Sequence, residues 1–523
     1  MKKFFRNLFS GYFFILLALL IEILVIIFLQ LFLDNIFEAI GADDAWLILV
    51  YLLIKLNTFI VAFIIFFKII NKWEDPEFKI PWIVGMLVLP LFTSFLFIVF
   101  GNHGLRRKDR KIIEATKKVN TAYYSLTEEQ AKELKTNMRS SYGTFNYITN
   151  TTNLGVHTNN RVTYYARGEE FFPAMLEGLK QAKEFIFMEF FIISDGKEWN
   201  NVTEILKEKA QQGVDVRIIY DDMGCGGTIS SRTPKILAKY GIKCYKFHPF
   251  RPILSGAYNN RDHRKIVIVD HQMAFTGGIN LADEYANEIK RFGYWKDTMI
   301  KIEGSAISNL ISVFFQNHDL CTNKVSDYEK YINYDYEQYD DNGYVMPFGD
   351  GPGGIDDALI GEQTYINMLN YAKDRVFIST PYLIPTYSLI DAMRNAAKRG
   401  VEVNLILPGI PDKKMVYSIS KSHFRYLLDS GVNIYLYTPG FNHMKAMSVD
   451  CKMAFVGTIN FDFRSLVHHF ECGALLVRSK CIKDIEDDFI DMLKVCTKVP
   501  QDFKLPLRTR SFCSIAKLFT TLM

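Results

Sequence analysis

The sequence contains two matching stretches, HRKIVIVDHQMAFTGGIN at residues 263–280 and HMKAMSVDCKMAFVGTIN at residues 443–460. Each opens with a histidine, carries a lysine two residues later, and ends on an asparagine 17 residues after the histidine. Within each stretch, the apolar residues between the histidine and the asparagine predict a strand. On a strand, residues two apart point to the same side. We therefore expect each stretch to present one imidazole and one ammonium group to a common pocket. A single match would carry little weight, but both continue into the same MAF and glycine-asparagine ending.

The stretches around these motifs repeat as well. LKQAKEFIFMEFFI from Leu179 is matched by LNYAKDRVFISTPYLI from Leu369, and AQQGVDVRIIYDD from Ala210 is matched by AAKRGVEVNLILPG from Ala396. Each has the pattern of a helix end followed by a buried strand, and a glycine closes the helix in the second pair. Helices that alternate with short strands indicate an α/β fold. The chain is therefore predicted to contain two similar halves packed about a pseudo-twofold axis.

Such packing would bring six polar side chains to one centre: His263, Lys265, Asn280, His443, Lys445 and Asn460. Lysines and asparagine amides suit the non-bridging oxygens of a phosphodiester and the charge of a five-coordinate transition state. One histidine can attack phosphorus while the other protonates the departing oxygen, because an imidazole titrates near neutral pH. The predicted reaction passes through a phosphohistidine and needs no metal and no cofactor.

Hydrophobic residues concentrate near the N-terminus, in segments at residues 11–33, 45–67 and 80–100. Each has about the length that a helix needs to cross roughly 30 Å of hydrocarbon, so transmembrane helices are predicted. The first segment is too long for a cleavable signal peptide and lacks a small-residue cleavage site. The protein is expected to be a multi-pass protein of the cell membrane.

Two charged residues, Glu22 and Lys55, lie inside the first two segments. Charges within a membrane usually pair, so a Glu22–Lys55 contact is predicted; the alternative is that both face water. Basic residues lie before the first segment and at 106–111 after the third, and both clusters favour the cytoplasm. Three full spans cannot satisfy both, so either the N-terminal signal is overridden or segment 80–100 enters without crossing. The C-terminal part is expected in the cytoplasm in either case.

The boundaries of the predicted parts follow changes in composition. The parts are a membrane region at 1–104, a basic juxtamembrane helical linker at 105–162, the first half at 163–323, an acidic linker at 324–354, the second half at 355–498 and an amphipathic tail at 499–523. The basic linker either attracts anionic headgroups or is a solvated helix face. The tail is expected to form a short helix that docks on the domain or on the bilayer.

Composition argues against two other classes of protein. A net charge of +4 over 523 residues is too small for a general polyanion-binding protein, so any basic attraction must be local. Membrane anchoring favours lipid over nucleic acid, so no nucleic acid is expected as a partner. The eight cysteines form no CxxC pair, which argues against a zinc site and against a disulfide framework.

At the paired motifs the chain resembles the phospholipase D superfamily, whose hallmark is HxKxxxxD with a downstream glycine-rich turn and asparagine. It is similar, more closely, to bacterial cardiolipin synthases, through its hydrophobic segments and through IIYDDMG at 218–224, STPYLIP at 379–385 and NFDFRS at 460–465. The resemblance covers approximately residues 163–498. It implies two α/β halves whose sheets face each other across the active site. Thr458 departs from the pattern, since a serine is commoner there.

The resemblance also implies roles for single residues. His263 would be the nucleophile, and His443 would be the general acid and later the base. Asp297 and Glu471 would each orient the histidine of the opposite half. The predicted catalytic set is completed by the remaining motif residues, Lys265, Asp270, Lys445 and Asp450. Asp270 and Asp450 are nevertheless expected to tie down the turn after each strand.

Cardiolipin synthases move a phosphatidyl group from one phosphatidylglycerol molecule to another and release glycerol. The resemblance therefore implies a phosphatidyltransferase that acts on phosphatidylglycerol and other anionic phospholipids at the membrane. A membrane-anchored phospholipase D, which passes the group to water, would use the same residues. A membrane-tethered phosphodiesterase or nuclease is a further alternative, and it would show a continuous basic track across the catalytic groove.

Overall fold

The computed structural model describes residues 45–72, 76–101, 104–124, 128–137, 141–249, 259–341, 343–352 and 358–522. These residues fall into two compact units. One contains the helices between residues 45 and 101, and the other contains residues 104–249 and 259–517. Each unit is described by itself.

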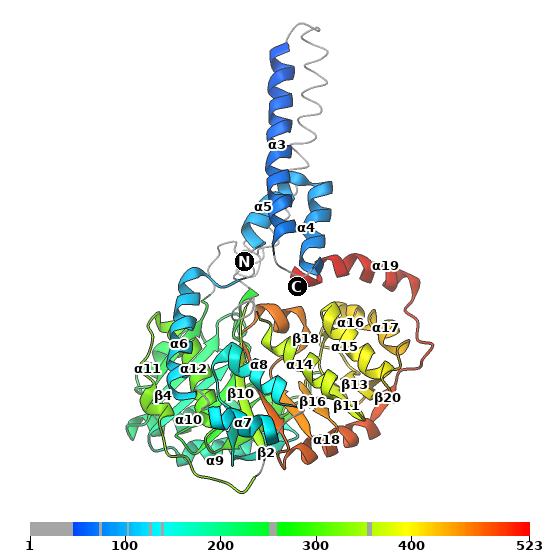
Figure 1. Cartoon of the computed structure of the whole chain (residues 1–523). Coiled ribbons are helices and arrows are strands. Elements are labelled where there is room, and N and C mark those ends of the chain that lie inside the picture. The colour runs from blue at the N-terminus through cyan, green and yellow to red at the C-terminus, as the bar shows by residue number, and fades with distance from the viewer. Residues whose placement is uncertain are drawn as a thin grey trace. The chain divides into compact units, whose positions relative to one another are not determined.

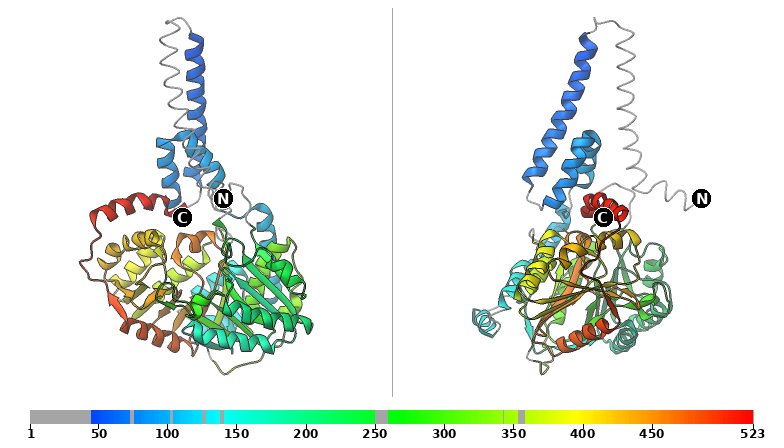
Figure 2. Two further views of the ribbon diagram at one scale, coloured as in Figure 1. Left: turned by 180° about the vertical axis from the view of Figure 1, so that it is seen from behind. Right: turned by 90° about the vertical axis from the view of Figure 1, so that its right-hand side faces the viewer.

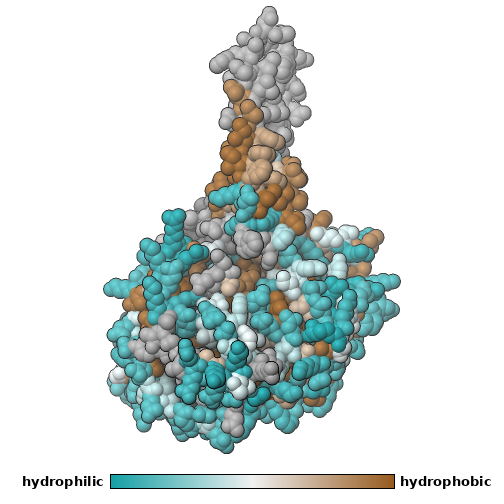
Figure 3. All heavy atoms as spheres, viewed as in Figure 1, coloured by the Kyte–Doolittle hydropathy of each residue, from teal (hydrophilic) through white to brown (hydrophobic). Residues whose placement is uncertain are grey.

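The N-terminal unit contains three described helices, α3 (Ala45–Asn71), α4 (Pro76–Val88) and α5 (Pro90–Phe100). They pack around a small core in which the Trp82 and Phe97 rings meet edge to face at 5.4 Å. Many of their other apolar side chains are exposed, and Figure 3 shows hydrophobic residues covering these helices. The predicted segment 80–100 is not one helix, because Pro90 lacks an N–H group and begins a new helix after Leu89.

Among the described residues, no helix combines the length and the apolar content that a bilayer crossing requires. The predicted segment 11–33 lies outside the described residues. The predicted Glu22–Lys55 contact lies outside them too, because the Lys55 side chain is not described.

The larger unit is built on two mixed sheets (Figures 1 and 2). The seven-stranded sheet has the order β2-β9-β7-β6-β3-β4-β5. Its strands are β2 (Arg161–Tyr165), β3 (Phe185–Phe190), β4 (Asp215–Asp221), β5 (Lys243–Phe247), β6 (Lys265–Val269), β7 (Met273–Gly277) and β9 (Met299–Glu303). Helices α9 (Gly168–Gln181) and α10 (Lys197–Gln211) bury their apolar faces in the core of this half.

The nine-stranded sheet has the order β1-β10-β19-β17-β16-β11-β13-β14-β20. Its strands are β1 (His157–Thr158), β10 (Tyr344–Asp350), β11 (Arg375–Ser379), β13 (Glu402–Pro408), β14 (Asn433–Tyr437), β16 (Ala446–Val449), β17 (Met453–Gly457), β19 (Glu471–Val477) and β20 (Cys496–Lys498). The six strands from β19 to β14 repeat the order of β9 to β5. The predicted duplication and the α/β fold class are therefore confirmed.

The two sheets meet through β7 of the first half and β17 and β19 of the second. Thr276 Oγ1 in β7 lies 3.4 Å from Cys472 Sγ in β19. Helix α12 (Ile307–Thr322) is buried along its length from Ile307 to Leu320, and it packs on β6 and β7 as well as on β10. The core therefore runs continuously from one half to the other.

Two predicted linkers contribute to the sheets, and this corrects the predicted boundaries. Residues 324–354 contain β10, which pairs with β19 over seven residues. Residues 105–162 contain α6 (Arg107–Tyr124), α7 (Glu128–Asn137), α8 (Tyr142–Thr152) and also β1, which pairs with β10. The first half begins with β2 at Arg161 rather than at 163. The turn-forming residues after Asp350 and the acidic residues before Tyr344 hid the short strand between them.

The tail after residue 498 forms helix α19 (Leu507–Ala516) followed by a 3-10 helix (Lys517–Leu522). The buried Cys513 of α19 donates from its Sγ to the Ser418 carbonyl of α16 (Lys414–Lys421) at 3.4 Å. The helix therefore docks on the second half, which is one of the two predicted arrangements.

The motif aspartates close the turn after β6 and after β16. Asp270 accepts hydrogen bonds from the backbone N–H groups of residues 183–185 at 2.7–2.9 Å. Asp450 accepts the matching three from residues 373–375 at 2.8–2.9 Å. Both have a positive φ, 50° and 52°, which aspartate tolerates better than most residues. These contacts agree with a structural role for both carboxylates.

Replacing Asp270 by alanine is expected to lower the free energy of unfolding by roughly 3 kcal/mol, because three buried or partly buried N–H groups lose a charged acceptor. Chemical denaturation of the purified protein measures this loss. Asp491→Ala is the matched control, since the side chain of Asp491 is 71% exposed. Equal stability of both variants would contradict the structural role of Asp270.

Candidate active site

Short segments of the two halves pair with each other beside the motif histidines. Strand β8 (Tyr294–Lys296) of the first half pairs in parallel with β15 (Gly440–Asn442) of the second, which leads directly into His443. On the other side, Asp262 forms a β-bridge with Phe470, and the next residues are His263 and Glu471. Each histidine therefore follows a segment that is paired with the opposite half.

Each histidine is held by its backbone and by its ring. His263 donates its backbone N–H to the Phe470 carbonyl at 2.8 Å, and its Nδ1 lies 2.9 Å from both carboxylate oxygens of Glu471. His443 donates its backbone N–H to the Lys296 carbonyl at 2.7 Å, and its Nδ1 lies 2.6 Å from Asp297 Oδ2. In each case, the carboxylate residue comes directly after the residue whose carbonyl accepts the histidine backbone N–H. A proton on Nδ1 of the neutral His263 ring leaves the lone pair on Nε2.

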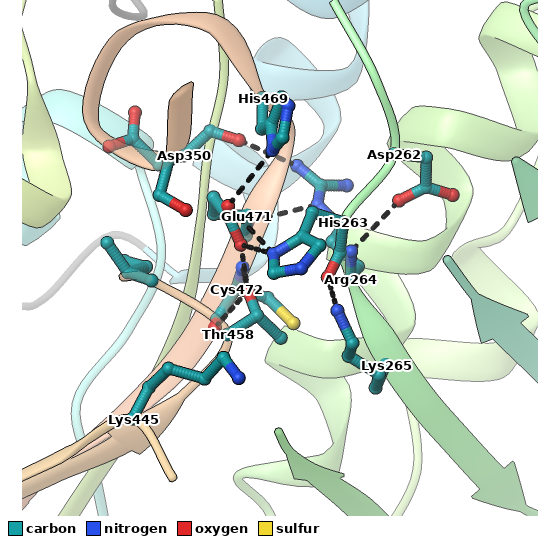
Figure 4. A network of polar contacts seen from close by, with 12 residues as sticks. Asp262, His263, Arg264, Lys265, Asp350, Lys445, Thr458, His469, Glu471 and Cys472 are labelled. Atoms are coloured by element: carbon teal, nitrogen blue, oxygen red, sulfur yellow. Dashed lines mark hydrogen bonds and ion pairs between the residues drawn. The ribbon is translucent and has the colours of Figure 1, made fainter. Parts of the chain in front are cut away.

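Both motif lysines are buried, and Figure 4 shows them near His263. Lys265 Nζ donates to the His263 carbonyl at 2.5 Å. Lys445 Nζ lies 2.7 Å from His443 Nδ1 and 3.9 Å from Asp297 Oδ2. Burial disfavours the ammonium form, so it lowers the pKa of Lys265 to about 8 and that of Lys445 to about 7.

The same environment acts on the imidazoles. Burial, and then the positive charges of Lys265 and Lys445, lower the pKa of His263 well below its usual value. Burial and the same two lysines lower the pKa of His443. Burial raises the pKa of Asp297 to about 6, against the opposing effect of Lys445. Both histidines are therefore neutral in this environment, and a neutral ring suits a nucleophile.

The halves differ at one position of the glycine-rich turn. In the first half, a Cβ on Gly278 would meet Asp297 Oδ1 at 2.0 Å, so only glycine leaves room for that carboxylate. In the second half, the equivalent Thr458 donates its hydroxyl to Glu471 Oε2 and accepts from the Cys472 backbone N–H at 2.9 Å. Thr458 therefore helps to hold Glu471, while Gly278 makes space for Asp297.

The two asparagines are buried but have different partners. Asn280 Oδ1 accepts from the Ile192 backbone N–H at 3.0 Å, and its Nδ2 donates to the Tyr285 hydroxyl at 2.7 Å. One N–H of its amide is left for another acceptor. The buried Asn460 Oδ1 has no hydrogen-bond partner among the described residues. The structure thus places both amides near the motif turns, and their binding of phosphate stays a prediction.

Two residues of the site escaped the sequence analysis. Arg264 is fully buried and points away from the His263 side, where it donates to the carbonyls of Glu471 at 3.0 Å and Val313 at 2.8 Å. His469 lies beside His263 with ring centroids 5.5 Å apart. The sequence showed only that Arg264 lies between His263 and Lys265, which are both predicted to face the pocket. His469 lies between a helical turn and β19 (Glu471–Val477), so strand periodicity gave no signal for it.

One described group of buried side chains has the composition of a metal site. His263, His469 and Glu471 each offer a ligand atom, and these atoms lie within 4.8 Å of one another. A reaction through a phosphohistidine needs no metal at these three residues.

The family model described as cardiolipin synthase, PLD-like domain, matches residues 175–318 and 365–493, which contain both motifs. Cardiolipin synthase 2 of Bacillus anthracis is 31% identical over 442 residues, with 84% of this chain and 85% of that protein covered. The chain belongs to the cardiolipin synthase family. The resemblance predicted from the motifs is thereby confirmed.

Two further likenesses fit this family assignment. An uncharacterised protein of Streptococcus mutans is 39% identical over 458 residues, covering 87% of this chain and 98% of that protein. The crystal structure of a phosphatidylserine synthase from Haemophilus influenzae superposes with a TM-score of 0.55 at 13% identity, covering 73% of this chain and 100% of that one. At that identity the superposition supports the fold alone.

Gly278→Ala is expected to lower turnover by at least about 100-fold, because the new Cβ would push the Asp297 carboxylate away from His443. Steady-state assays with phosphatidylglycerol measure the loss. Thr458→Ser is the matched control at the equivalent position, and it should keep most of the activity because the hydroxyl remains. Full activity of Gly278→Ala would show that the position of Asp297 does not matter.

Proposed function

We propose that the protein is a cardiolipin synthase, which transfers a phosphatidyl group between two phosphatidylglycerol molecules through a phosphohistidine intermediate. The observation that carries this proposal is the pair of buried histidines, each bound through Nδ1 to a carboxylate of the opposite half. Family membership supports transfer to a lipid as the outcome.

In the first step, Nε2 of His263 attacks the phosphorus of one phosphatidylglycerol. The P–N bond forms, and the bond between phosphorus and the glycerol headgroup oxygen breaks. His443 gives its Nε2 proton to that oxygen, so glycerol leaves as a neutral alcohol. Lys265 and Lys445 offset the negative charge that builds up on the non-bridging oxygens. The Asn280 and Asn460 amides are proposed as further donors to these oxygens.

In the second step, His443 takes the proton from a headgroup hydroxyl of a second phosphatidylglycerol. That oxygen attacks phosphorus, the P–N bond breaks, and His263 returns to its neutral form. Cardiolipin is released, and His443 again carries the proton needed for the next cycle. Asp297 and Glu471 are proposed to fix the ring orientation of His443 and His263 in both steps.

The negative charge of the substrate favours the protonated form of His443 that this cycle requires. His443 has a lowered pKa in the empty site, where the lysines repel an added positive charge. A phosphodiester bound between the lysines brings one negative charge and raises the pKa of His443 toward the neutral range. The general acid is thus charged only when substrate is present.

We also propose that the N-terminal helices hold the protein in the cell membrane, with the catalytic unit in the cytoplasm. The exposed apolar side chains of α3, α4 and α5 support this arrangement. So does the basic run at 106–111, because positive residues next to hydrophobic segments favour the cytoplasmic side.

The purified protein, given labelled phosphatidylglycerol alone, is expected to form cardiolipin and glycerol in equal amounts. His263→Ala and His443→Ala should each lower this rate by at least about 10⁴-fold, because one removes the nucleophile and the other the proton carrier. His271→Asn, at the other end of β6, is the matched histidine control and should stay active.

Phosphatidic acid in place of cardiolipin would identify the protein as a hydrolase with the same machinery. Turnover by His263→Ala would refute the assigned nucleophile.

The value of kcat/KM is expected to fall as pH rises through about 7, because it reports the free enzyme, in which Lys445 has a pKa of about 7 and loses its charge above it. The groups that act on Lys445 besides burial are Asp297, Lys265, Glu471 and Asp462. Lys445→Arg keeps the charge and should move the fall to higher pH. An unchanged profile in that variant would contradict the assignment.

A further inference from the structure

His469 has no role in the proposed reaction, but its buried ring could bind a ligand. It follows the π-helical turn η4 (Arg464–His468) and donates its backbone N–H to the Arg464 carbonyl at 2.8 Å. Its side chain is only 7% exposed. Its Nδ1 lies 3.5 Å from Glu471 Oε1, and neither ring nitrogen forms a hydrogen bond among the described residues. A buried imidazole without a close hydrogen bond is costly, so a ligand that satisfies it would stabilise the site.

The neighbours of His469 complete a set of metal ligands (Figure 4). Glu471 Oε1 lies 2.9 Å from His263 Nδ1 and 3.5 Å from His469 Nδ1. Ligand atoms around a tetrahedral zinc ion lie about 3.3 Å apart, as follows from bonds of about 2.0 Å. These two distances bracket this spacing, and the ligand atoms of the three residues lie within 4.8 Å of one another.

The types of ligand also fit. Two imidazoles and one carboxylate are the protein ligands of many zinc sites that keep a fourth position open. All three side chains are buried, which shields a bound ion from competing water. They come from both halves, since His263 precedes β6, whereas Glu471 begins β19 and His469 lies two residues before it. A bound ion would therefore join the halves at the nucleophile itself.

We propose that His263, His469 and Glu471 form an inhibitory site for a zinc-type divalent cation. The inhibition rests on the proposed function, whereas binding of the ion does not. An ion on Nδ1 of His263 uses the lone pair of that nitrogen, so the neutral ring carries its proton on Nε2 instead. Nε2 then has no lone pair for phosphorus. The ion also binds the Glu471 carboxylate and thereby breaks its hydrogen bond with His263.

The test uses the full-length protein in a neutral detergent, freed of metal with a chelator and titrated with zinc chloride in the presence of a coloured zinc indicator. Wild type is expected to bind one zinc ion per chain. His469→Asn, which replaces the imidazole by a shorter amide, should bind it at least ten times more weakly. His468→Asn is the matched control, because this neighbouring histidine lies outside the ligand set, and its zinc affinity should equal that of wild type.

The second measurement is turnover of phosphatidylglycerol at increasing zinc concentration, expressed relative to the rate of each variant without zinc. The zinc concentration for half-inhibition should rise at least tenfold in His469→Asn and stay constant in His468→Asn. Thermal unfolding without zinc shows whether the variants fold, and His469→Gln replaces His469→Asn if that variant does not.

No zinc binding by wild type, or equal affinity of wild type and the His469 variant, would overturn the proposed site. Normal binding without inhibition would overturn the inhibitory role. If wild type binds zinc at His469 but makes no cardiolipin, the proposed function fails while the metal site stands.

Discussion

The active site depends on a reciprocal clamp between the two halves. Each histidine gives its backbone N–H to the residue before a carboxylate of the opposite half, and the same carboxylate binds its ring. Neither half can position its own imidazole, because the orienting carboxylate belongs to the other. The sheets must therefore stay in register for any chemistry to occur. The continuous packing of β7 against β17 and β19, together with the buried α12, maintains that register.

The protonation state of the site depends on whether substrate is bound. Lys265 and Lys445 offset Asp297 and Glu471, so the empty cluster has two positive groups against two negative groups when both imidazoles are neutral. A phosphodiester adds one negative charge, which one imidazolium neutralises. Burying unbalanced charge is costly, so the site favours the protonated general acid at the moment when the leaving group needs a proton. The fully buried Arg264 sits among Glu189 and Asp262, and burial raises the pKa of both of these carboxyls against the opposing charge of Arg264.

The sequence allowed prediction of the duplicated fold and of the residues at its centre, since strand periodicity and matched motifs are local features. The expectation that Asp270 and Asp450 tie down the turn after each strand agrees with their hydrogen bonds to backbone N–H groups. Strand β10 was missed, because a strand of seven residues between acidic and glycine-rich stretches gains its stability from pairing with β19 and β1 rather than from its own sequence. His469 and Arg264 were missed for a similar reason. Their significance comes from which residues of the other half lie beside them, and no local pattern encodes that.

The central claim is that His263 and His443 act on a single phosphorus atom. The most direct measurement is a crystal structure of the protein with vanadate, which adopts the five-coordinate geometry of phosphoryl transfer. The account predicts one vanadium atom bonded to Nε2 of His263, with Nε2 of His443 within hydrogen-bond distance of an oxygen on its opposite side. Vanadate bound to neither ring, or the two imidazoles facing separate cavities, would contradict it.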